Sequence, residues 1–225
     1  REVADGDLVV VDGNEGQVHL RPGPETERRY RSRLRRQLRR ERDLEARREL
    51  PAITLDGRDI TLMANVDVPT EVQVALDYGA RGVGMYRTEF LYLNYRLPSE
   101  DEQFKVYSDI VEAMAPRPVV IRTLDLGGDK LSHVLESPPE ANPFLGWRGI
   151  RICLDTPDLF KTQLRALLRA GTRGEVQILL PMISSLDELW RARALLNEAK
   201  DELRQAGQAF AEDCKLGIMV EVPSV

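Results

Sequence analysis

The sequence predicts an α/β protein built on a parallel β-sheet. From about residue 52 onward, five short apolar segments alternate with segments whose apolar residues recur at helical spacing. The apolar segments are nearly continuous runs, which is typical of strands covered on both faces. An open doubly wound sheet and a closed (β/α)8 barrel both fit this alternation.

The composition sets further limits on the class of protein. The chain has 225 residues, of which 42% are hydrophobic and 31% charged, and its formal net charge is −5. Its apolar runs fall short of the roughly 18 residues of a membrane span, and no signal peptide opens it, so we expect a cytoplasmic protein without membrane insertion. The negative charge argues against nucleic-acid binding. Two distant cysteines suggest neither a disulfide framework nor a zinc site.

The first 51 residues predict a hairpin followed by a helix. In residues 1–24, two short β-type runs flank the turn signal Asp12-Gly13-Asn14. Residues 25–51 then lack glycine and proline until Pro51, which predicts one long helix. Its apolar residues form only a narrow stripe among arginines and glutamates, so we interpret it as a solvated helical linker. The alternative, binding of nucleic acid or a membrane surface, lacks an aromatic platform and a broad apolar face.

The remaining chain predicts five strands joined by four helices. Ser99 and Glu102 form a capping-box signal at the start of the second of these helices. Asp155 or Thr156 is the predicted cap of the third helix, and Gly171 its end. The predicted strands are residues 59–66, 82–86, 118–125, 175–182 and 215–223, and the predicted helices are 69–80, 99–115, 156–171 and 184–207.

Polar side chains follow the predicted strands where function gathers in such sheets, at the carboxyl ends. Asn65, Arg87, Arg122 and Glu221 each lie at or just after a strand end. An arginine presents a planar fork of donors that suits phosphate or carboxylate oxygens, so two of them predict a small anion as ligand. Glu221 could supply an oxygen to Mg²⁺, which prefers carboxylates together with substrate oxygens.

Several of these residues also fit a purely structural interpretation. Arg87 could form a salt bridge with Glu89, and the charged residues of the segment after Arg122 could bridge one another within a loop. Arg148 is a third candidate anion ligand, within a long proline-rich segment that could cover an active site. The candidate loop contacts are Asp125, Asp129 and Lys130, which follow Arg122 and precede this proline-rich segment, together with Asn65.

Five blocks resemble a known family in the same order along the chain: GARGVGMYRTEFLYL, VVIRTLDLGGDK, NPFLGWRGIRI, ILLPMISSLDEL and GIMVEVPS. The family is enzyme I of the bacterial phosphoenolpyruvate-dependent phosphotransferase system. The resemblance implies a phosphoenolpyruvate-binding (β/α)8 barrel from about residue 52, here truncated to about five of eight strands. It also implies that residues 1–24 end a β-containing phosphohistidine domain and that 25–51 are the linker.

The resemblance also implies roles for single residues. Arg87, Arg122 and, less directly, Arg148 match residues that bind phosphoenolpyruvate, and Glu221 matches a ligand of Mg²⁺. The implied reaction moves the phosphoryl group to a histidine and then to a small histidine phosphocarrier protein (HPr-like). The family forms homodimers through its barrel.

The sequence also departs from the family's pattern. Neither of its two histidines lies in the family's phosphohistidine segment, and the segments carrying the second metal ligand and the proton-donating cysteine are missing. We therefore expect no catalytic residue in this chain and a fragment that is inactive alone, with exposed sheet edges that make it prone to aggregate. The phosphorylated histidine is expected before Arg1.

Two other functions remain open from the sequence. Pyruvate phosphate dikinase and phosphoenolpyruvate synthase share the barrel and a mobile phosphohistidine domain, although the blocks resemble enzyme I more closely. From a different class, the truncated chain could serve only as a dimerisation module. The blocks fit both the sugar-transport and the nitrogen-regulatory branch of the phosphotransferase system.

Overall fold

The computed structural model describes residues 3–48, 50–92, 96–127 and 146–225. It contains two compact units, residues 1–51 and 52–225, and each is described by itself. The expected loop contacts Asp129 and Lys130 lie outside the described residues.

The first unit is a β-hairpin followed by a helix, as the sequence predicts. β1 (Val9–Asp12) pairs antiparallel with β2 (Gln17–Leu20). The Asp12 carboxylate accepts hydrogen bonds from the backbone N–H groups of Asn14 and Glu15, both at 3.1 Å. An aspartate that bonds the backbone two residues ahead makes the chain turn, which explains the hairpin signal.

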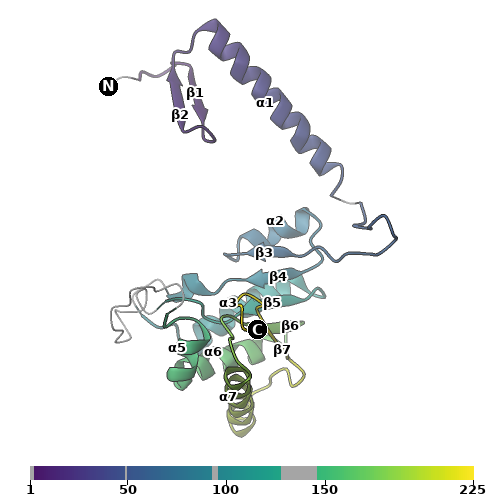
Figure 1. Ribbon diagram of the computed structural model, residues 1–225, viewed down its shortest axis with the longest axis vertical. Coiled ribbons are helices and arrows are strands. Elements are labelled where there is room, and N and C mark those ends of the chain that lie inside the picture. The colour runs from purple at the N-terminus through teal and green to yellow at the C-terminus, as the bar shows by residue number, and fades with distance from the viewer. Residues whose placement is uncertain (1–2, 49, 93–95, 128–145) are drawn as a thin grey trace. The chain divides into compact units, whose positions relative to one another are not determined.

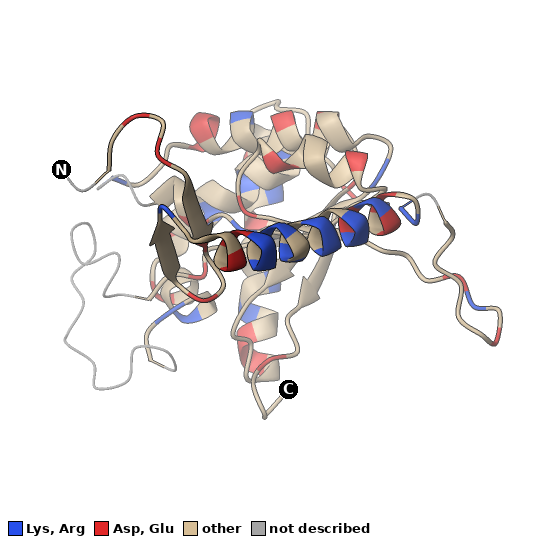
Figure 2. Cartoon of the chain, turned by 90° about the horizontal axis from the view of Figure 1, so that it is seen from above, with Lys and Arg blue, Asp and Glu red and all other residues tan. Residues whose placement is uncertain are grey.

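α1 (Pro24–Glu45) is the predicted solvated helix, but it ends five residues before Leu50. Its last residues run toward Pro51, and the residue before a proline is disfavoured in helical geometry. None of its side chains is buried, and arginines colour most of its length in Figure 2. The Tyr30 ring packs near His19, with 5.2 Å between the ring centroids. No helix in the described part of the chain is long and apolar enough to cross a membrane.

The second unit is built on a five-stranded parallel sheet (Figure 1). The strands are adjacent in the order in which they occur along the chain, and every neighbouring pair is parallel. They are β3 (Ala64–Val66), β4 (Val83–Tyr86), β5 (Val119–Arg122), β6 (Val176–Leu180) and β7 (Lys215–Ile218).

Helices connect these strands. α3 contacts α2 and α6, and α6 contacts α7, so the helices follow one another in the same order as the strands. They are α2 (Glu71–Asp77), α3 (Glu100–Met114), α5 (Ile150–Asp155), α6 (Pro157–Ala170) and α7 (Leu186–Gln205), with a short 3-10 helix, η1 (Glu89–Tyr92), after β4.

The sequential strand order decides between the two sheets that the sequence allows. A doubly wound sheet reverses its strand order at a switch point, which sends helices to both faces. Here the order never reverses, and right-handed crossovers that all run in one direction place every helix on one face. This arrangement is a partial (β/α) barrel, which confirms the barrel that the sequence resemblance implies.

The core lies between the sheet and the helices that cover it. On β5, the side chains of Val119 and Ile121 are fully buried, whereas Val120 and Arg122 are half-buried. Successive side chains of a strand point to opposite faces, so this alternation assigns Arg122 to the face away from the buried core. β6 shows the same alternation of buried and half-buried residues.

Some predicted boundaries are wrong. Residues 59–63 were expected to begin the first strand, but pairing starts only at Ala64, and exposed side chains such as Leu62 precede it. β7 ends at Ile218, so Glu221 follows the strand after a short loop. α5 was not predicted, because its six residues are too few to show a helical period.

Both cysteines are free thiols. Cys153 is fully buried in α5, and burial raises its pKa far above the ordinary value for a thiol. Cys214 is half-buried beside β7, and desolvation raises its pKa to about 11. Both side chains are therefore protonated at neutral pH and serve as packing groups.

The capping box predicted for α3 is confirmed. The Ser99 side chain accepts a hydrogen bond from the Glu102 N–H at 3.3 Å, and the Glu102 carboxylate accepts one from the Ser99 N–H at 2.9 Å. Ser185 and Glu188 form the same motif at α7. Thr156, by contrast, begins α6 without a side-chain cap, because its hydroxyl donates back to the Ile152 carbonyl.

Ser99→Ala should lower the free energy of unfolding by about 1 kcal/mol, because the first turn of α3 loses a hydrogen-bond acceptor. Thr70→Ala is the matched control, since Thr70 begins α2 without a side-chain cap, and it should change stability by less than about 0.5 kcal/mol. Urea unfolding followed by circular dichroism measures both. Equal losses in the two variants would contradict the assigned role of Ser99.

Candidate functional site

Arg122, the last residue of β5, is held between two carboxylates. Its Nη2 lies 2.6 Å from Oε1 of Glu89, and its Nη1 lies 2.9 Å from Oδ2 of Asp125. Only 12% of the Arg122 side chain is exposed, and the exposed fractions of Glu89 and Asp125 are 18% and 5%. A guanidinium that is nearly withdrawn from water needs such partners, because an unpaired buried charge is costly.

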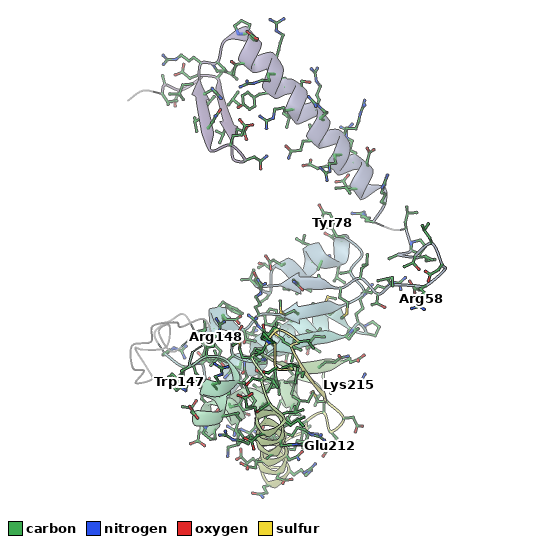
Figure 3. All side chains as sticks on the ribbon, viewed as in Figure 1. Arg58, Tyr78, Trp147, Arg148, Glu212 and Lys215 are labelled. Atoms are coloured by element: carbon green, nitrogen blue, oxygen red, sulfur yellow. The ribbon has the colours of Figure 1, made fainter. Side chains whose placement is uncertain are left out.

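Asp125 joins Arg122 to a second arginine. Its Oδ1 accepts hydrogen bonds from Nη2 and Nε of Arg148 at 2.9 and 3.1 Å, while its Oδ2 faces Arg122. Arg148 also forms a backbone bridge with Gly127, which ties the segment before α5 to the end of β5. Figure 3 labels Arg148 beside Trp147, just before α5. The carboxylate thus fixes the positions of two guanidinium groups at once.

Gly149 allows this close approach. Its φ of +57° lies in the left-handed region, which other residues rarely adopt. A Cβ atom at this position would lie 3.2 Å from Oδ1 of Asp125 and 3.1 Å from Cγ of Met182. A side chain here would therefore push against the carboxylate that holds Arg122 and Arg148.

The cluster of Arg122, Arg148, Glu89 and Asp125 carries no net formal charge, because two cations face two anions. An arginine has five N–H donors, and the two carboxylates occupy only two of those on Arg122. The Nε atom of Arg122 is buried and has no hydrogen-bond partner among the described residues. Arg122 therefore keeps N–H donors that Glu89 and Asp125 do not use.

Arg87, at the end of β4, is not part of this cluster. Its Nη1 donates to both carboxylate oxygens of Asp67, at 2.9 and 3.0 Å. The alternative salt bridge between Arg87 and Glu89 is therefore wrong, since Glu89 turns to Arg122 instead. The pair with Asp67 is about half exposed, and such pairs contribute little stability. An anion can exchange with Asp67 at low cost.

Glu221 lies in the segment after β7, and its Oε1 accepts a hydrogen bond from the backbone N–H of Met182 at 2.7 Å. Its other oxygen has no hydrogen-bond partner among the described residues, and the side chain is exposed. One carboxylate of this kind fits a Mg²⁺ ion that takes its remaining ligands from water and substrate oxygens. The described residues contain no group of three or more acidic, histidine or cysteine side chains that could hold a metal without such help.

Contacts among the strand ends place Glu221 on the same side of the sheet as the arginine cluster. The Met182 side chain lies beside Gly149, next to the arginine cluster. Met219, two residues before Glu221, has its sulfur 4.0 Å from Nη1 of Arg122. Asn65 is exposed on β3, and its side chain forms no hydrogen bond within the described part of the chain. The structure thus brings together Arg122, Arg148, Asp125 and the segment of Glu221.

Three contributors to this site escaped the sequence analysis in part or completely. Glu89 was considered only as a partner of Arg87, and Asp67 was not considered. Thr88 is fully buried, and its hydroxyl donates to the Arg122 carbonyl at 3.1 Å. The sequence does contain a signal for Thr88, because the pair Arg-Thr occurs near the ends of the second and third predicted strands, at 87–88 and at 122–123.

Comparisons with known proteins agree with one another. Residues 41–225 match the family described as PEP-utilising enzyme, PEP-binding domain. The chain is 46% identical over 224 residues to a phosphoenolpyruvate-protein phosphotransferase of Geobacillus stearothermophilus, and 44% identical to proteins of the same name from Staphylococcus carnosus (strain TM300) and Bacillus subtilis (strain 168). Each match covers 99% of this chain but only 39% of the relative.

Asp125→Ala should lower the free energy of unfolding by about 3 kcal/mol, because it leaves two nearly buried guanidinium groups without their shared carboxylate. Asp109→Ala is the control, since Asp109 pairs with Lys105 on the exposed face of α3 and should contribute less than about 1 kcal/mol. Chemical denaturation of both variants gives the two values. A loss for Asp125→Ala no larger than that of the control would refute the bridging role.

Proposed function

The chain belongs to the family of PEP-utilising enzymes through their PEP-binding domain, and on this basis we propose that it forms the substrate-binding part of a phosphoenolpyruvate-protein phosphotransferase. The proposed reaction transfers the phosphoryl group of phosphoenolpyruvate to a histidine and then to a small histidine phosphocarrier protein, and it releases pyruvate. The relatives named above carry this name. None of those names refers to a dikinase or a synthase, so the enzyme I function is favoured.

The observation that carries the proposal is the arginine held at the end of β5. Arg122 is 12% exposed, bound by Glu89 and Asp125, and still has donors for a further anion. A phosphate or carboxylate accepts two parallel hydrogen bonds from such a fork. Because the surrounding cluster is neutral, the anion also needs other positive charge, for which Arg87 and the proposed Mg²⁺ are suited.

The residues of this chain act mainly by binding and positioning. Arg122 and Arg148, held rigid by Asp125, are proposed to bind the phosphate and carboxylate of phosphoenolpyruvate, and Arg87 to exchange Asp67 for substrate. In phosphoryl transfer the protein lowers the barrier chiefly by positioning and by neutralising charge on the transferring oxygens. Glu221 would hold Mg²⁺, whose contribution when bound is to neutralise further charge on those oxygens.

Several other properties of the whole protein are also proposals. The chain spans 39% of the length of the relatives it matches, so the phosphorylated histidine is proposed to lie in another part of the protein. Residues 1–24 would end the phosphohistidine domain, residues 25–51 would link it to the barrel, and residues 52–225 would belong to the barrel. A cytoplasmic homodimer that serves sugar transport completes the proposal, with the nitrogen-regulatory branch as its alternative.

Arg122→Ala in the full-length protein should weaken phosphoenolpyruvate binding about 100-fold, because it removes charge-assisted hydrogen bonds and leaves Glu89 and Asp125 facing the anion. Arg173→Ala is the control, since Arg173 is about half exposed beside Glu112, and it should leave the affinity unchanged. Isothermal titration calorimetry measures both. Unchanged affinity in Arg122→Ala would exclude this arginine as a ligand.

The full-length protein, incubated with phosphoenolpyruvate and Mg²⁺, should form an acid-labile phosphohistidine and pass the phosphoryl group to a histidine phosphocarrier protein. The isolated 225-residue chain should form none. Mass spectrometry under alkaline conditions and a coupled assay for pyruvate measure both steps. Turnover that requires ATP or AMP would instead support a dikinase or a synthase.

A further inference from the structure

A buried hydrogen-bond network connects helix α6 to the ends of β4 and β5. Its centre is Gln163, whose side chain is fully buried. The Gln163 Oε1 accepts from the Leu124 N–H at 3.0 Å, and its Nε2 donates to the Thr88 hydroxyl at 3.3 Å and to the Tyr107 hydroxyl at 3.1 Å. A glutamine amide has two N–H donors, so both are used here.

The direction of each hydrogen bond in this network is determined by its partners. The Leu124 N–H can only donate, so the amide oxygen of Gln163 must face it. The Thr88 hydroxyl donates to the Arg122 carbonyl, so it must accept from Gln163. The Tyr107 hydroxyl likewise accepts from Gln163 and donates to Oε1 of Gln103 at 3.0 Å. Only an uncharged amide at position 163 satisfies all of these bonds.

The two residues that Gln163 holds on the strand ends adjoin the charged cluster. Thr88 lies between Arg87 and Glu89, and Leu124 directly precedes Asp125. The bond from Thr88 to the Arg122 carbonyl adds a further link between the two strand ends, at 3.1 Å. Gln163 therefore bonds the residue that precedes each carboxylate bound to Arg122: Thr88 before Glu89, and Leu124 before Asp125.

On the basis of the phosphoenolpyruvate-binding function above, we propose that Gln163 is a positioning residue that holds Glu89 and Asp125 in register around Arg122. Gln163 does not touch the anion. It acts from α6, on the helix side of the sheet, and fixes the spacing of the ends of β4 and β5. Without it the Leu124 N–H loses its acceptor, the Thr88 hydroxyl keeps only its bond to the Arg122 carbonyl, and the two carboxylates can separate.

The far end of the same network offers a control. The Tyr92 hydroxyl donates to Oε1 of Gln103 at 3.2 Å, and it is fully buried like Gln163. Burial raises the pKa of Tyr107, so its hydroxyl stays protonated as a donor between the two glutamines. Tyr92 lies in η1 together with Glu89, so Tyr92→Phe removes a buried hydrogen bond near the same carboxylate while it leaves every bond of Gln163 in place.

The test compares Gln163→Met with Tyr92→Phe in the full-length protein, with pyruvate release from phosphoenolpyruvate as the assay. Gln163→Met should raise KM about tenfold with kcat within about twofold, because misplaced arginines weaken ground and transition states equally. Tyr92→Phe should change neither constant by more than about twofold. Equal effects of the two variants, or an unchanged KM in Gln163→Met, would overturn the proposal.

A second pair of variants covers the case in which Gln163→Met does not fold. Thr88→Val removes the hydroxyl at nearly constant volume and should raise KM in the same way, whereas Thr88→Ser keeps the hydroxyl and should retain the unmodified KM. A rise in KM for Thr88→Ser as large as that for Thr88→Val would contradict the role of the hydrogen bonds.

Hydrogen exchange separates this proposal from the proposed function. The Leu124 amide should exchange at least about tenfold faster in Gln163→Met than in Tyr92→Phe, measured by NMR or by mass spectrometry of peptides covering residues 119–126. If the unmodified protein does not turn over phosphoenolpyruvate, the proposed function fails, and this measurement alone decides whether Gln163 holds the end of β5. Equal exchange rates in the two variants would show that it does not.

Discussion

The placement of one positive charge away from water governs much of this structure. Arg122 lies at the end of a strand with 12% of its side chain exposed, and desolvation of a guanidinium is tolerated only when anions and hydrogen-bond partners surround it. Glu89 from η1 and Asp125 from the segment after β5 provide the anions. Asp125 then also binds Arg148, which ties the start of α5 to the same point.

The parallel sheet makes this arrangement possible. Because all five strands run in the same direction, their carboxyl ends meet at one edge, where residues at or just after the ends of β4, β5, β6 and β7 contact one another. The helices behind the sheet contribute as well, since α6 supplies a buried amide that bonds residues after β4 and β5 from the core side, and α3 supplies a tyrosine hydroxyl that bonds this amide. The arginine cluster is thus supported from the helix side of the sheet.

Local patterns were reliable wherever local forces dominate. The hairpin turn at Asp12 and the capping box at Ser99 follow from hydrogen bonds between residues two or three positions apart, and both are present. The partner of Glu89 was not predictable in this way. Proximity in sequence favoured Arg87, but the structure pairs Glu89 with Arg122, 33 residues away. The distance in sequence between two residues does not reveal toward which neighbouring strand a short segment such as η1 folds.

The sequence by itself determined the α/β class, the alternation of strands and helices, the candidate residues Arg122 and Glu221 near strand ends, and the candidate Arg148 before α5. From periodicity alone it could not distinguish a doubly wound sheet from a barrel, because both repeat the same unit; the resemblance to enzyme I implied the barrel. Tertiary structure confirmed that choice through the sequential order of β3 to β7. It alone decided that Asp125 also binds Arg148 and that Gln163 bonds both strand ends, since these contacts join residues 23 to 75 positions apart.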